Sequence, residues 1–202
     1  MTASQRTTPA AYFEAIYADD DPFGYRSRWY EARKRELLLA SLPKARFASV
    51  WELGCSNGEL TDALAARGDR LLATDLDARA VSLAQARTAR HPHVRIARMQ
   101  HPGQWPATQF DLIVFSEVGY YFDEAALAEV ASGLRDALAP DGTLVACHWL
   151  HPFDAAPLCG RRVHARLAAV LGASAFHYED ADLRLEGWTV QDRSVAQREA
   201  LR

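Results

Sequence analysis

Two carboxylates and a glycine-rich turn stand at the ends of two short apolar segments of the sequence. The first segment, 48–53, carries Glu52 and leads into the turn GCSNG at 54–58. The second segment, 71–74, is followed at once by Asp75. Glycine lets the backbone pass close to a ligand, and an ionised carboxylate can accept hydrogen bonds from both hydroxyls of a ribose. The pattern therefore predicts a site for a ribose-containing ligand.

The spacing of the glycines separates this turn from the loop that binds a dinucleotide. Gly54 and Gly58 are four residues apart with Ser56 midway, whereas the GxGxxG loop spaces its glycines by two and three. Asp75 follows Gly58 by 17 residues. An alternative role for Asp75 is to cap the next helix, with Asp77 as a second candidate. The turn thus indicates a ligand site, but its glycine spacing does not match a loop that binds a pyrophosphate.

A third group of residues could act on an acceptor. The most apolar segment, 110–115, is followed by Ser116 and Glu117, and His148 stands near the end of the segment 143–149. A carboxylate or a histidine at the tip of a strand can take a proton or orient a substrate, because the histidine pKa lies near 6.5. The alternative for His148 is a packed, hydrogen-bonded ring. Glu117 and His148 are the predicted catalytic residues.

The histidines do not indicate a metal centre. His148, His151 and His164 fall within 17 residues, but no acidic cluster at ligand spacing accompanies them. The three cysteines form no CxxC pair. We therefore predict no metal site and no disulfide framework.

Strands and helices alternate through the middle of the chain. Predicted strands cover 48–53, 71–74, 94–97, 110–115 and 143–149, predicted helices cover 59–67, 78–90 and 124–138, and 101–109 is predicted as loop. The motif PDG at 140–142 is predicted to close the last of these helices as a turn. This alternation is typical of βαβ units, in which a parallel sheet carries helices on both faces.

The two ends of the chain differ from the middle. Helices are predicted at 12–17, 28–41 and 161–171, and a hairpin of strands at 174–180 and 185–192. The expected fold is α/β, a doubly wound seven-stranded sheet, mostly parallel, with an antiparallel C-terminal strand. We expect one domain over 1–202, with an N-terminal helical cap (1–45) near the ligand edge of a core (46–202).

The composition excludes several classes of partner. The 202 residues are 49% hydrophobic and 24% charged, with 23 basic and 26 acidic side chains and a formal net charge of −3. This balance gives no electrostatic reason to expect a nucleic acid or an anionic membrane as partner. No apolar run reaches the roughly 18 residues of a membrane span, and 1–10 lacks the apolar centre of a secretory signal. A cytoplasmic protein is the expectation.

Taken together, these features resemble the class I S-adenosylmethionine-dependent methyltransferases over 50–149. Four motifs resemble the nodulation protein S group more closely: DPFGYR at 21–26, WYEARK at 29–34, SEVGYY at 116–121 and CHWLHP at 147–152. With them the resemblance extends over 12–188. The type member of that group N-methylates the free amine of a chitin-like oligosaccharide.

The resemblance implies a cofactor, an acceptor and the residues that bind them. The cofactor is S-adenosyl-L-methionine, and the residues implied to bind it are Trp29, Arg33, Glu52, Gly54, Cys55, Ser56, Gly58, Asp75, Leu76, Met99, Gln100 and Ser116. The acceptor is a small molecule, an amino sugar or oligosaccharide amine, and the residues implied to bind it are Tyr25, Tyr120, Tyr121 and His151. Ordinary packing is the alternative for the tyrosines.

One position departs from the methyltransferase pattern. Arg98 stands about where an acidic residue is often found near the adenine amine, so backbone groups and the apolar faces of Met99 and Trp105 are expected to hold the adenine instead. Three other functions stay open: O-methylation of another metabolite, a nicotinamide-dependent oxidoreductase, and a non-catalytic cofactor-binding module that regulates a partner.

Overall fold

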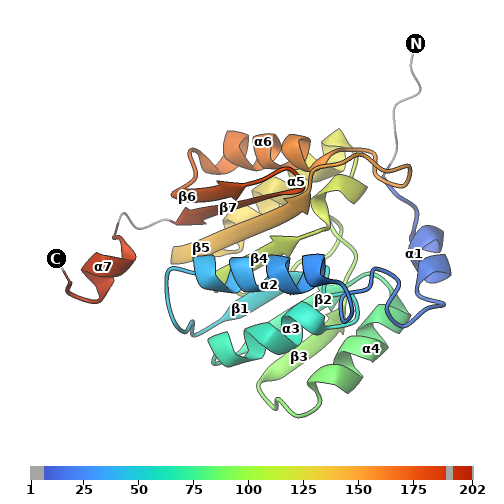
Figure 1. Ribbon diagram of the computed structural model, residues 1–202, viewed down its shortest axis with the longest axis horizontal. Coiled ribbons are helices and arrows are strands. Elements are labelled where there is room, and N and C mark those ends of the chain that lie inside the picture. Colours follow the sequence, from blue (N-terminus) through green and yellow to red (C-terminus); the bar gives the residue numbers. More distant parts are fainter. Residues whose placement is uncertain (1–6, 190–192, 202) are drawn as a thin grey trace.

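Seven strands form one sheet in the computed structural model, which describes residues 7–189 and 193–201 (Figure 1). The strands are β1 (Val50–Leu53), β2 (Leu71–Asp75), β3 (Val94–Arg98), β4 (Phe110–Ser116), β5 (Leu138–Trp149), β6 (Phe176–Glu179) and β7 (Leu183–Thr189). The helices are α1 (Ala10–Ile16), α2 (Trp29–Ser41), α3 (Glu59–Leu64), α4 (Ala78–Thr88), α5 (Glu124–Asp136), α6 (Gly160–Leu171) and α7 (Val195–Arg198). Two 3₁₀ turns, η1 (Ala65–Arg67) and η2 (Gly119–Tyr121), follow α3 and β4.

The order of the strands is β3-β2-β1-β4-β5-β7-β6. The five strands from β3 to β5 pair in parallel, whereas β7 runs antiparallel between β5 and β6. The chain winds outward from β1 in one direction and from β4 in the other, and such a switch point leaves a crevice at the carboxyl ends of the strands. The predicted doubly wound sheet with an antiparallel C-terminal strand is confirmed.

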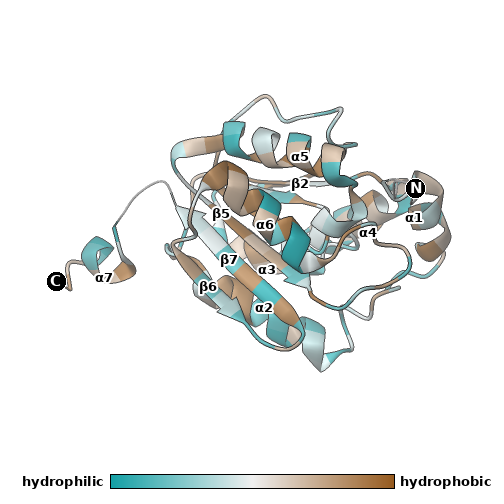
Figure 2. Cartoon of the chain, turned by 90° about the horizontal axis from the view of Figure 1, so that it is seen from above, coloured by the Kyte–Doolittle hydropathy of each residue, from teal (hydrophilic) through white to brown (hydrophobic). Residues whose placement is uncertain are grey.

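The side chains of β4 explain why helices cover both faces of the sheet. Leu112 and Val114 belong to one buried cluster, which also holds Leu38 of α2 and Leu64 of α3. The neighbouring Ile113 and Phe115 point to the opposite face, where they join a second buried cluster with apolar residues of α5 and α6. Figure 1 shows α5 and α6 together on one side of the sheet. In Figure 2 hydrophobic and hydrophilic residues alternate along these two helices, as expected of helices with one buried face.

The prediction that a helix reaches residue 138 and that PDG at 140–142 closes it as a turn was wrong. Helix α5 ends at Asp136, and β5 already begins at Leu138 and includes the PDG motif at 140–142. Phe110 pairs with Leu138, but Leu112 pairs with Thr143, so the register shifts between them and the extra residues of β5 bulge outward. Residues 139–142 lie between the paired positions of β5, so Pro140, which has no N–H, removes no hydrogen bond from the ladder.

Other boundaries differ by a few residues. The predicted helix 59–67 divides into α3 and η1, and the predicted strands 174–180 and 185–192 are β6 and β7. Residues 190–192 of the last predicted strand lie outside the described residues. The longest described helices have 13 residues, and none has the length and apolar character that a bilayer crossing requires.

The N-terminal segment lies over the carboxyl ends of the central strands, as the sequence predicts. The Thr8 N–H donates to the Tyr121 carbonyl at 2.8 Å, and the Phe13 and Tyr121 rings meet edge to face at 5.0 Å. Asn57 in the turn after β1 donates to Asp20 and Asp21 of the loop between α1 and α2. These contacts make the segment the roof of the crevice.

Candidate functional site

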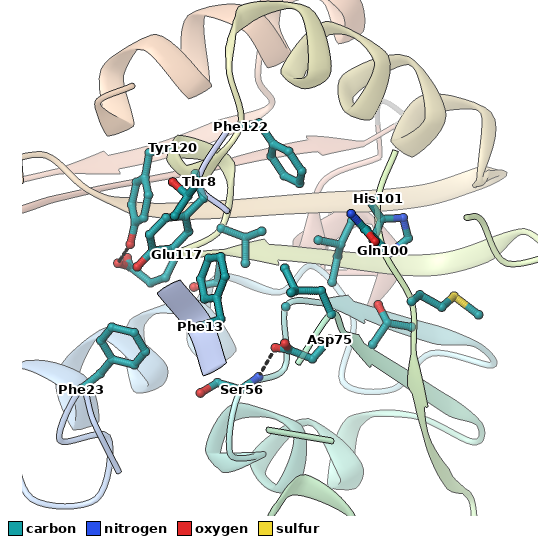
Figure 3. Close-up of a pocket in the computed structure, with 18 of the residues that line it drawn as sticks. Thr8, Phe13, Phe23, Ser56, Asp75, Gln100, His101, Glu117, Tyr120 and Phe122 are labelled. Atoms are coloured by element: carbon teal, nitrogen blue, oxygen red, sulfur yellow. Dashed lines mark hydrogen bonds between the residues drawn. The ribbon is translucent and has the colours of Figure 1, made fainter. Parts of the chain in front are cut away.

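A cavity of about 1010 Å³, counting the part open to solvent, lies between this roof and the ends of β1, β2 and β4 (Figure 3). Its size suits a ligand as large as a nucleoside together with a second small molecule. The predicted site residues that line it are Tyr25, Gly54, Ser56, Asp75, Leu76, Met99, Gln100, Ser116, Glu117, Tyr120 and Tyr121. Residues from four predicted strand ends therefore meet in one space.

Asp75 stands at the end of β2 and is held by backbone donors. Its Oδ2 accepts the Ser56 N–H at 2.9 Å, drawn in Figure 3, and its Oδ1 accepts the Asp77 N–H at 3.0 Å. Helix α4 is capped by Asp77, whose carboxylate accepts the N–H groups of Arg79 and Ala80. The helix-cap alternative for Asp75 is thus wrong, and its carboxylate is free to face a ligand.

Burial raises the pKa of Asp75 to about 6, although the N–H groups of Asp77 and Ser56 oppose the shift. The carboxylate is therefore mostly ionised at neutral pH, as an acceptor of ribose hydroxyl hydrogens has to be. Leu76 and Met99 continue the wall beyond it, together with the exposed Gln100. A carboxylate followed by an apolar slot matches the chemistry of a ribose joined to a purine.

Two residues that the sequence placed near an adenine lie elsewhere. Arg98 turns its Nε to the Leu76 carbonyl at 2.9 Å. Trp105 does not line the cavity and packs against Gly133 of α5, where an added Cβ would come within 2.1 Å of its ring. The expectation for Trp105 is corrected, because its ring fills the space between the loop and α5, whereas Met99 does line the cavity.

The two predicted glycines are needed for packing as well as for the turn. Gly54 has φ +82°, and a Cβ there would lie 2.0 Å from Val118 Cγ2. Gly58 has φ +81°, and its Cβ would lie 2.8 Å from the Cα of Ala84 on α4. Gly58 does not line the cavity, so its predicted contact with a ligand is corrected to a contact between helices.

Glu52 and Cys55 face a smaller adjoining recess. Glu52 is 2% exposed, and its Oε2 accepts the Thr61 hydroxyl hydrogen at 2.6 Å. Burial raises its pKa to about 8, which the Thr61 hydrogen bond opposes only in part. Glu52 is therefore largely protonated at neutral pH and serves as a neutral, buried hydrogen-bonding group.

Glu117 stands at the sharp turn after β4, with φ +59°. Its Oε2 accepts the Tyr120 hydroxyl hydrogen at 2.5 Å, and its Oε1 accepts the Trp149 N–H at 3.0 Å. Burial raises the pKa of Tyr120 well above its usual value, so the phenol keeps its proton and stays a donor. These contacts fix the carboxylate at the edge of the cavity, as Figure 3 shows.

Two charged residues of α2 complete this part of the cavity, although the sequence argument gave them no role. The Lys34 Nζ lies 2.8 Å from Glu31 Oε2 and 3.6 Å from Glu117 Oε1. Burial disfavours the ammonium, but the charges of Glu117 and Glu31 outweigh it and raise the pKa of Lys34. Glu31 and Lys34 both belong to the motif WYEARK at 29–34, which was the one feature of the sequence that could have pointed to them.

Aromatic rings form much of the remaining wall. Phe13, Tyr17 and Phe23 line the cavity beside the predicted Tyr25 and Tyr121. The Tyr17 hydroxyl donates to Ser56 Oγ at 2.6 Å, which ties the roof to the turn after β1. The sequence predictions did not include Phe13, Tyr17 or Phe23, because only the folded N-terminal segment brings these rings over the strands.

The structure places His148 outside the cavity. Its ring is fully buried, its Nε2 accepts the Gly119 N–H at 3.1 Å, and its Nδ1 lies 3.2 Å from Nε2 of His164. Burial lowers the pKa of His148 well below its usual value, and the charges of His164 and Lys34 act in the same direction. This corrects the placement expected for a catalytic base, since both ring nitrogens already have protein partners.

Three further predicted residues lie on the outer surface. Trp29 is 71% exposed, Arg33 donates to the Tyr178 hydroxyl and to Asp180, and His151 pairs with Asp182 at 2.9 Å. None of them lines the cavity. Their predicted contacts with cofactor or acceptor are corrected, because the outward faces of α2 and of the loop after β5 carry them away from it. Within the described ranges, no three His, Cys, Asp or Glu side chains gather closely enough to hold a metal ion.

Comparisons with known proteins show which family the chain resembles. The family model for Nodulation protein S (NodS) matches residues 11–170. Nodulation protein S of Bradyrhizobium diazoefficiens is 32% identical over 134 residues, which cover 65% of this chain and 64% of that protein. The Rhizobium tropici protein of the same name is 33% identical over 63% of this chain and 55% of its own length. The chain thus matches less than two thirds of the length of these relatives.

Two solved structures are similar over more of the chain. The N-methyltransferase NodS from Bradyrhizobium japonicum WM9, in complex with S-adenosyl-L-homocysteine, is 27% identical, with a TM-score of 0.78 over 92% of this chain and 98% of its own. A candidate methyltransferase from Pseudomonas syringae is 46% identical, with a TM-score of 0.72 over 80% of this chain and 99% of its own.

Proposed function

The chain belongs to the nodulation protein S family of S-adenosylmethionine-dependent methyltransferases, and on that premise we propose that it methylates an amine of a small-molecule acceptor. One observation carries the proposal. A single cavity has a nucleoside-type wall at Asp75 and a carboxylate cluster at Glu117. The two walls would bring a nucleoside cofactor and a cationic acceptor into one enclosed space.

The cofactor would lie along the ends of β1 and β2. The Asp75 carboxylate would accept the ribose hydroxyl hydrogens, and Leu76 and Met99 would cover the base. When bound, S-adenosylmethionine supplies an activated methyl group on its sulfonium sulfur. The task left to the protein is to position the acceptor and to exclude water, and Phe13 and Tyr121 of the aromatic wall support both.

The acceptor would lie beside Glu117. Its carboxylate is fixed by Tyr120 and Trp149, and it offers a negative charge to an ammonium group or an acceptor for a sugar hydroxyl. The aromatic rings of Tyr25 and Tyr121 can pack on the apolar face of a sugar. We propose an amino sugar or a chitin-like oligosaccharide amine, in keeping with the N-methyltransferase named among the similar structures.

The cellular setting is proposed on the chemistry of the cysteines. Cys55, Cys147 and Cys159 are all free thiols, and free thiols persist in a reducing compartment. The cytoplasm is the simplest such compartment.

Two titrations and one transfer assay test the proposed function. Calorimetry with S-adenosylhomocysteine should give a binding curve, and the same titration with NAD should not. Transfer of labelled methyl from S-adenosylmethionine to glucosamine or de-N-acetylated chitobiose should then be measurable. Binding without transfer to any amine or hydroxyl would favour a non-catalytic cofactor-binding module, and binding of NAD alone would favour an oxidoreductase.

A further inference from the structure

Lys34 lies between two carboxylates in the wall of the cavity. Its Nζ is 2.8 Å from Glu31 Oε2 and 3.6 Å from Glu117 Oε1, and its side chain is 8% exposed. The Tyr25 and Tyr30 rings flank the ammonium at 5.8 and 5.2 Å from their centroids. Two carboxylates thus share one ammonium at close distance, and the more distant Arg35 affects Glu31 less than Lys34 or Glu117 does. This part of the cavity is therefore suited to a ligand that carries a positive charge.

The two carboxylates differ in the donors that hold them. Both oxygens of Glu117 are engaged, Oε2 by the Tyr120 hydroxyl and Oε1 by the Trp149 N–H. Glu31 also lines the cavity, and its Oε2 contacts the Lys34 ammonium. The two fixed donors hold Glu117 in place as a binding carboxylate, whereas Glu31 has a single close partner, Lys34, and keeps lone pairs that can accept a proton.

We propose that Glu31 takes the proton from the ammonium form of the acceptor, while Glu117 holds the acceptor in place. The inference rests on the proposed methylation of an amine. In this step an N–H bond of the ammonium breaks, its electron pair stays on nitrogen as the lone pair, and the proton forms an O–H bond with a carboxylate oxygen of Glu31. The proton leaves for solvent when the product departs, which returns Glu31 to the carboxylate.

The surroundings of Glu31 favour this exchange. Burial raises its pKa, Lys34 opposes the shift most strongly, and Glu117 adds to it. The charged groups that face Glu31 are Lys34 and Arg35 on α2 and Glu117 after β4. The titratable groups Tyr25, Tyr30 and Cys147 also lie near, and burial raises the pKa of each, so all three stay neutral. A raised pKa of the Glu31 carboxyl group lies closer to the pKa of an ammonium group, and a smaller difference makes the proton transfer easier.

Glu31→Gln tests the proposal, because glutamine keeps the shape of the side chain but cannot take a proton. Glu36→Gln is the matched control, since Glu36 is exposed on the same helix. Glu31→Asp is the conservative variant, in which a shorter carboxylate retains the chemistry. Each protein is titrated with S-adenosylhomocysteine, melted, and assayed with glucosamine and with de-N-acetylated chitobiose between pH 6 and pH 9.

We expect Glu31→Gln to bind S-adenosylhomocysteine within about twofold of the unmodified chain, because Glu31 faces the acceptor side. Its kcat at pH 7 should fall by roughly 10²- to 10⁴-fold, the usual range for loss of a general base. The loss should shrink about tenfold per pH unit toward pH 9, as solvent takes over the deprotonation of the amine. Glu31→Asp should recover part of the rate, and Glu36→Gln should keep all of it.

Two results would overturn the role of Glu31. One is a pH profile of Glu31→Gln parallel to that of the unmodified chain, with a loss no larger than that of Glu36→Gln. The other is an unmodified chain that binds S-adenosylhomocysteine but neither binds nor methylates these amines; the cofactor proposal would then stand without the proton step. A chain that binds no S-adenosylhomocysteine would instead fail the proposed function itself.

Discussion

Nδ1 of His148 lies 3.2 Å from Nε2 of His164 in the interior of the protein. Since the Gly119 N–H donates to the other nitrogen of His148, the His148 proton must sit on Nδ1 and point to His164. His164 in turn carries its proton on Nδ1 and donates it to Glu186 at 2.7 Å. The chain of hydrogen bonds thus runs in one direction, and both imidazoles are neutral.

The chain of hydrogen bonds ends at the carboxylate of Glu186, whose negative charge is balanced by its neighbours. Glu186 is buried, which would raise its pKa, but the hydrogen bonds from His164 and Arg184 outweigh burial and lower the pKa to about 2. The other end of the chain holds the backbone of Gly119, two residues after Glu117. His148 therefore supports the turn that carries Glu117 and does not face the acceptor.

His148→Gln should change the pH dependence of stability more than the chemistry. Burial lowers the pKa of both His148 and His164, so the unfolded chain binds more protons than the folded chain between their folded pKa values and about 6.5. The free energy of unfolding should therefore fall as the pH drops below about 6.5. Denaturant titrations at pH 7.5 and pH 5.5 should show a smaller fall for His148→Gln.

The exposed His177 provides the matched control, since His177→Gln removes a histidine that lies outside the hydrogen-bond chain of His148 and His164. The variant His148→Gln should also keep its affinity for S-adenosylhomocysteine. A shift of the pH profile of kcat in His148→Gln, with stability unaltered, would return His148 to a catalytic role.

Asp75→Asn should weaken S-adenosylhomocysteine binding by about 2–4 kcal/mol, because hydrogen bonds to a charged group contribute roughly 1.5–3 kcal/mol each and do not add fully. The affinity of the unmodified chain should also fall as the pH drops through about 6, where Asp75 takes up a proton and loses acceptor capacity. Calorimetry from pH 5 to pH 8 measures both effects.

Asp77→Asn separates ligand binding from helix capping. Asp77 caps α4 through two N–H groups, so its substitution should cost at most about 1 kcal/mol of stability, since asparagine is itself a good cap. It should leave the affinity for S-adenosylhomocysteine intact. Equal losses of affinity in the two variants would contradict the assignment of the ribose to Asp75.

The stability of Glu52→Gln relative to the unmodified protein should increase as the pH rises. Burial raises the folded pKa of Glu52 to about 8, above its value in the unfolded chain, so its contribution to stability is full at low pH and is lost as the pH rises toward 8. The loss amounts to at most about 1.4 kcal/mol per pH unit. Glutamine can still accept the Thr61 hydrogen bond but does not titrate.

Denaturant midpoints of both proteins at pH 5, pH 7 and pH 8.5 measure this difference. The advantage of Glu52→Gln should grow from pH 5 to pH 8.5. An advantage that is constant across the three pH values would mean that Glu52 is ionised throughout.

Gly54→Ala should destabilise the protein before any ligand is considered. Its Cβ would lie 2.0 Å from Val118 Cγ2, and a φ of +82° adds roughly 1–2 kcal/mol of strain for any residue with a Cβ. Truncation of the neighbour in Gly54→Ala/Val118→Ala should recover the steric part and leave the backbone strain. Thermal melts of the four proteins of this double-mutant cycle measure the coupling, and additive losses would argue against the contact.

The order of the elements and the carboxyl ends of the strands could be predicted from local sequence patterns. Short apolar runs such as 110–115, separated by helices, indicate buried parallel strands, and parallel strands bring their carboxyl ends to one edge of the sheet. Gly54, Asp75 and Glu117 could therefore be predicted as neighbours without coordinates. The motif WYEARK at 29–34 could also be recognised in the sequence. A motif does not show, however, which of its side chains face the interior.

The tertiary structure alone decided which side chains reach the cavity. On α2 the turn of the helix points Glu31 and Lys34 inward and leaves Trp29 and Arg33 at the surface, because the rotation of a helix against a sheet is set by packing of residues such as Leu38. His148 was predicted at a strand tip, but alternate residues of a strand face opposite sides, and its side faces α6. Placement of a strand end follows from local pattern, whereas the direction of a side chain depends on contacts made by distant parts of the chain.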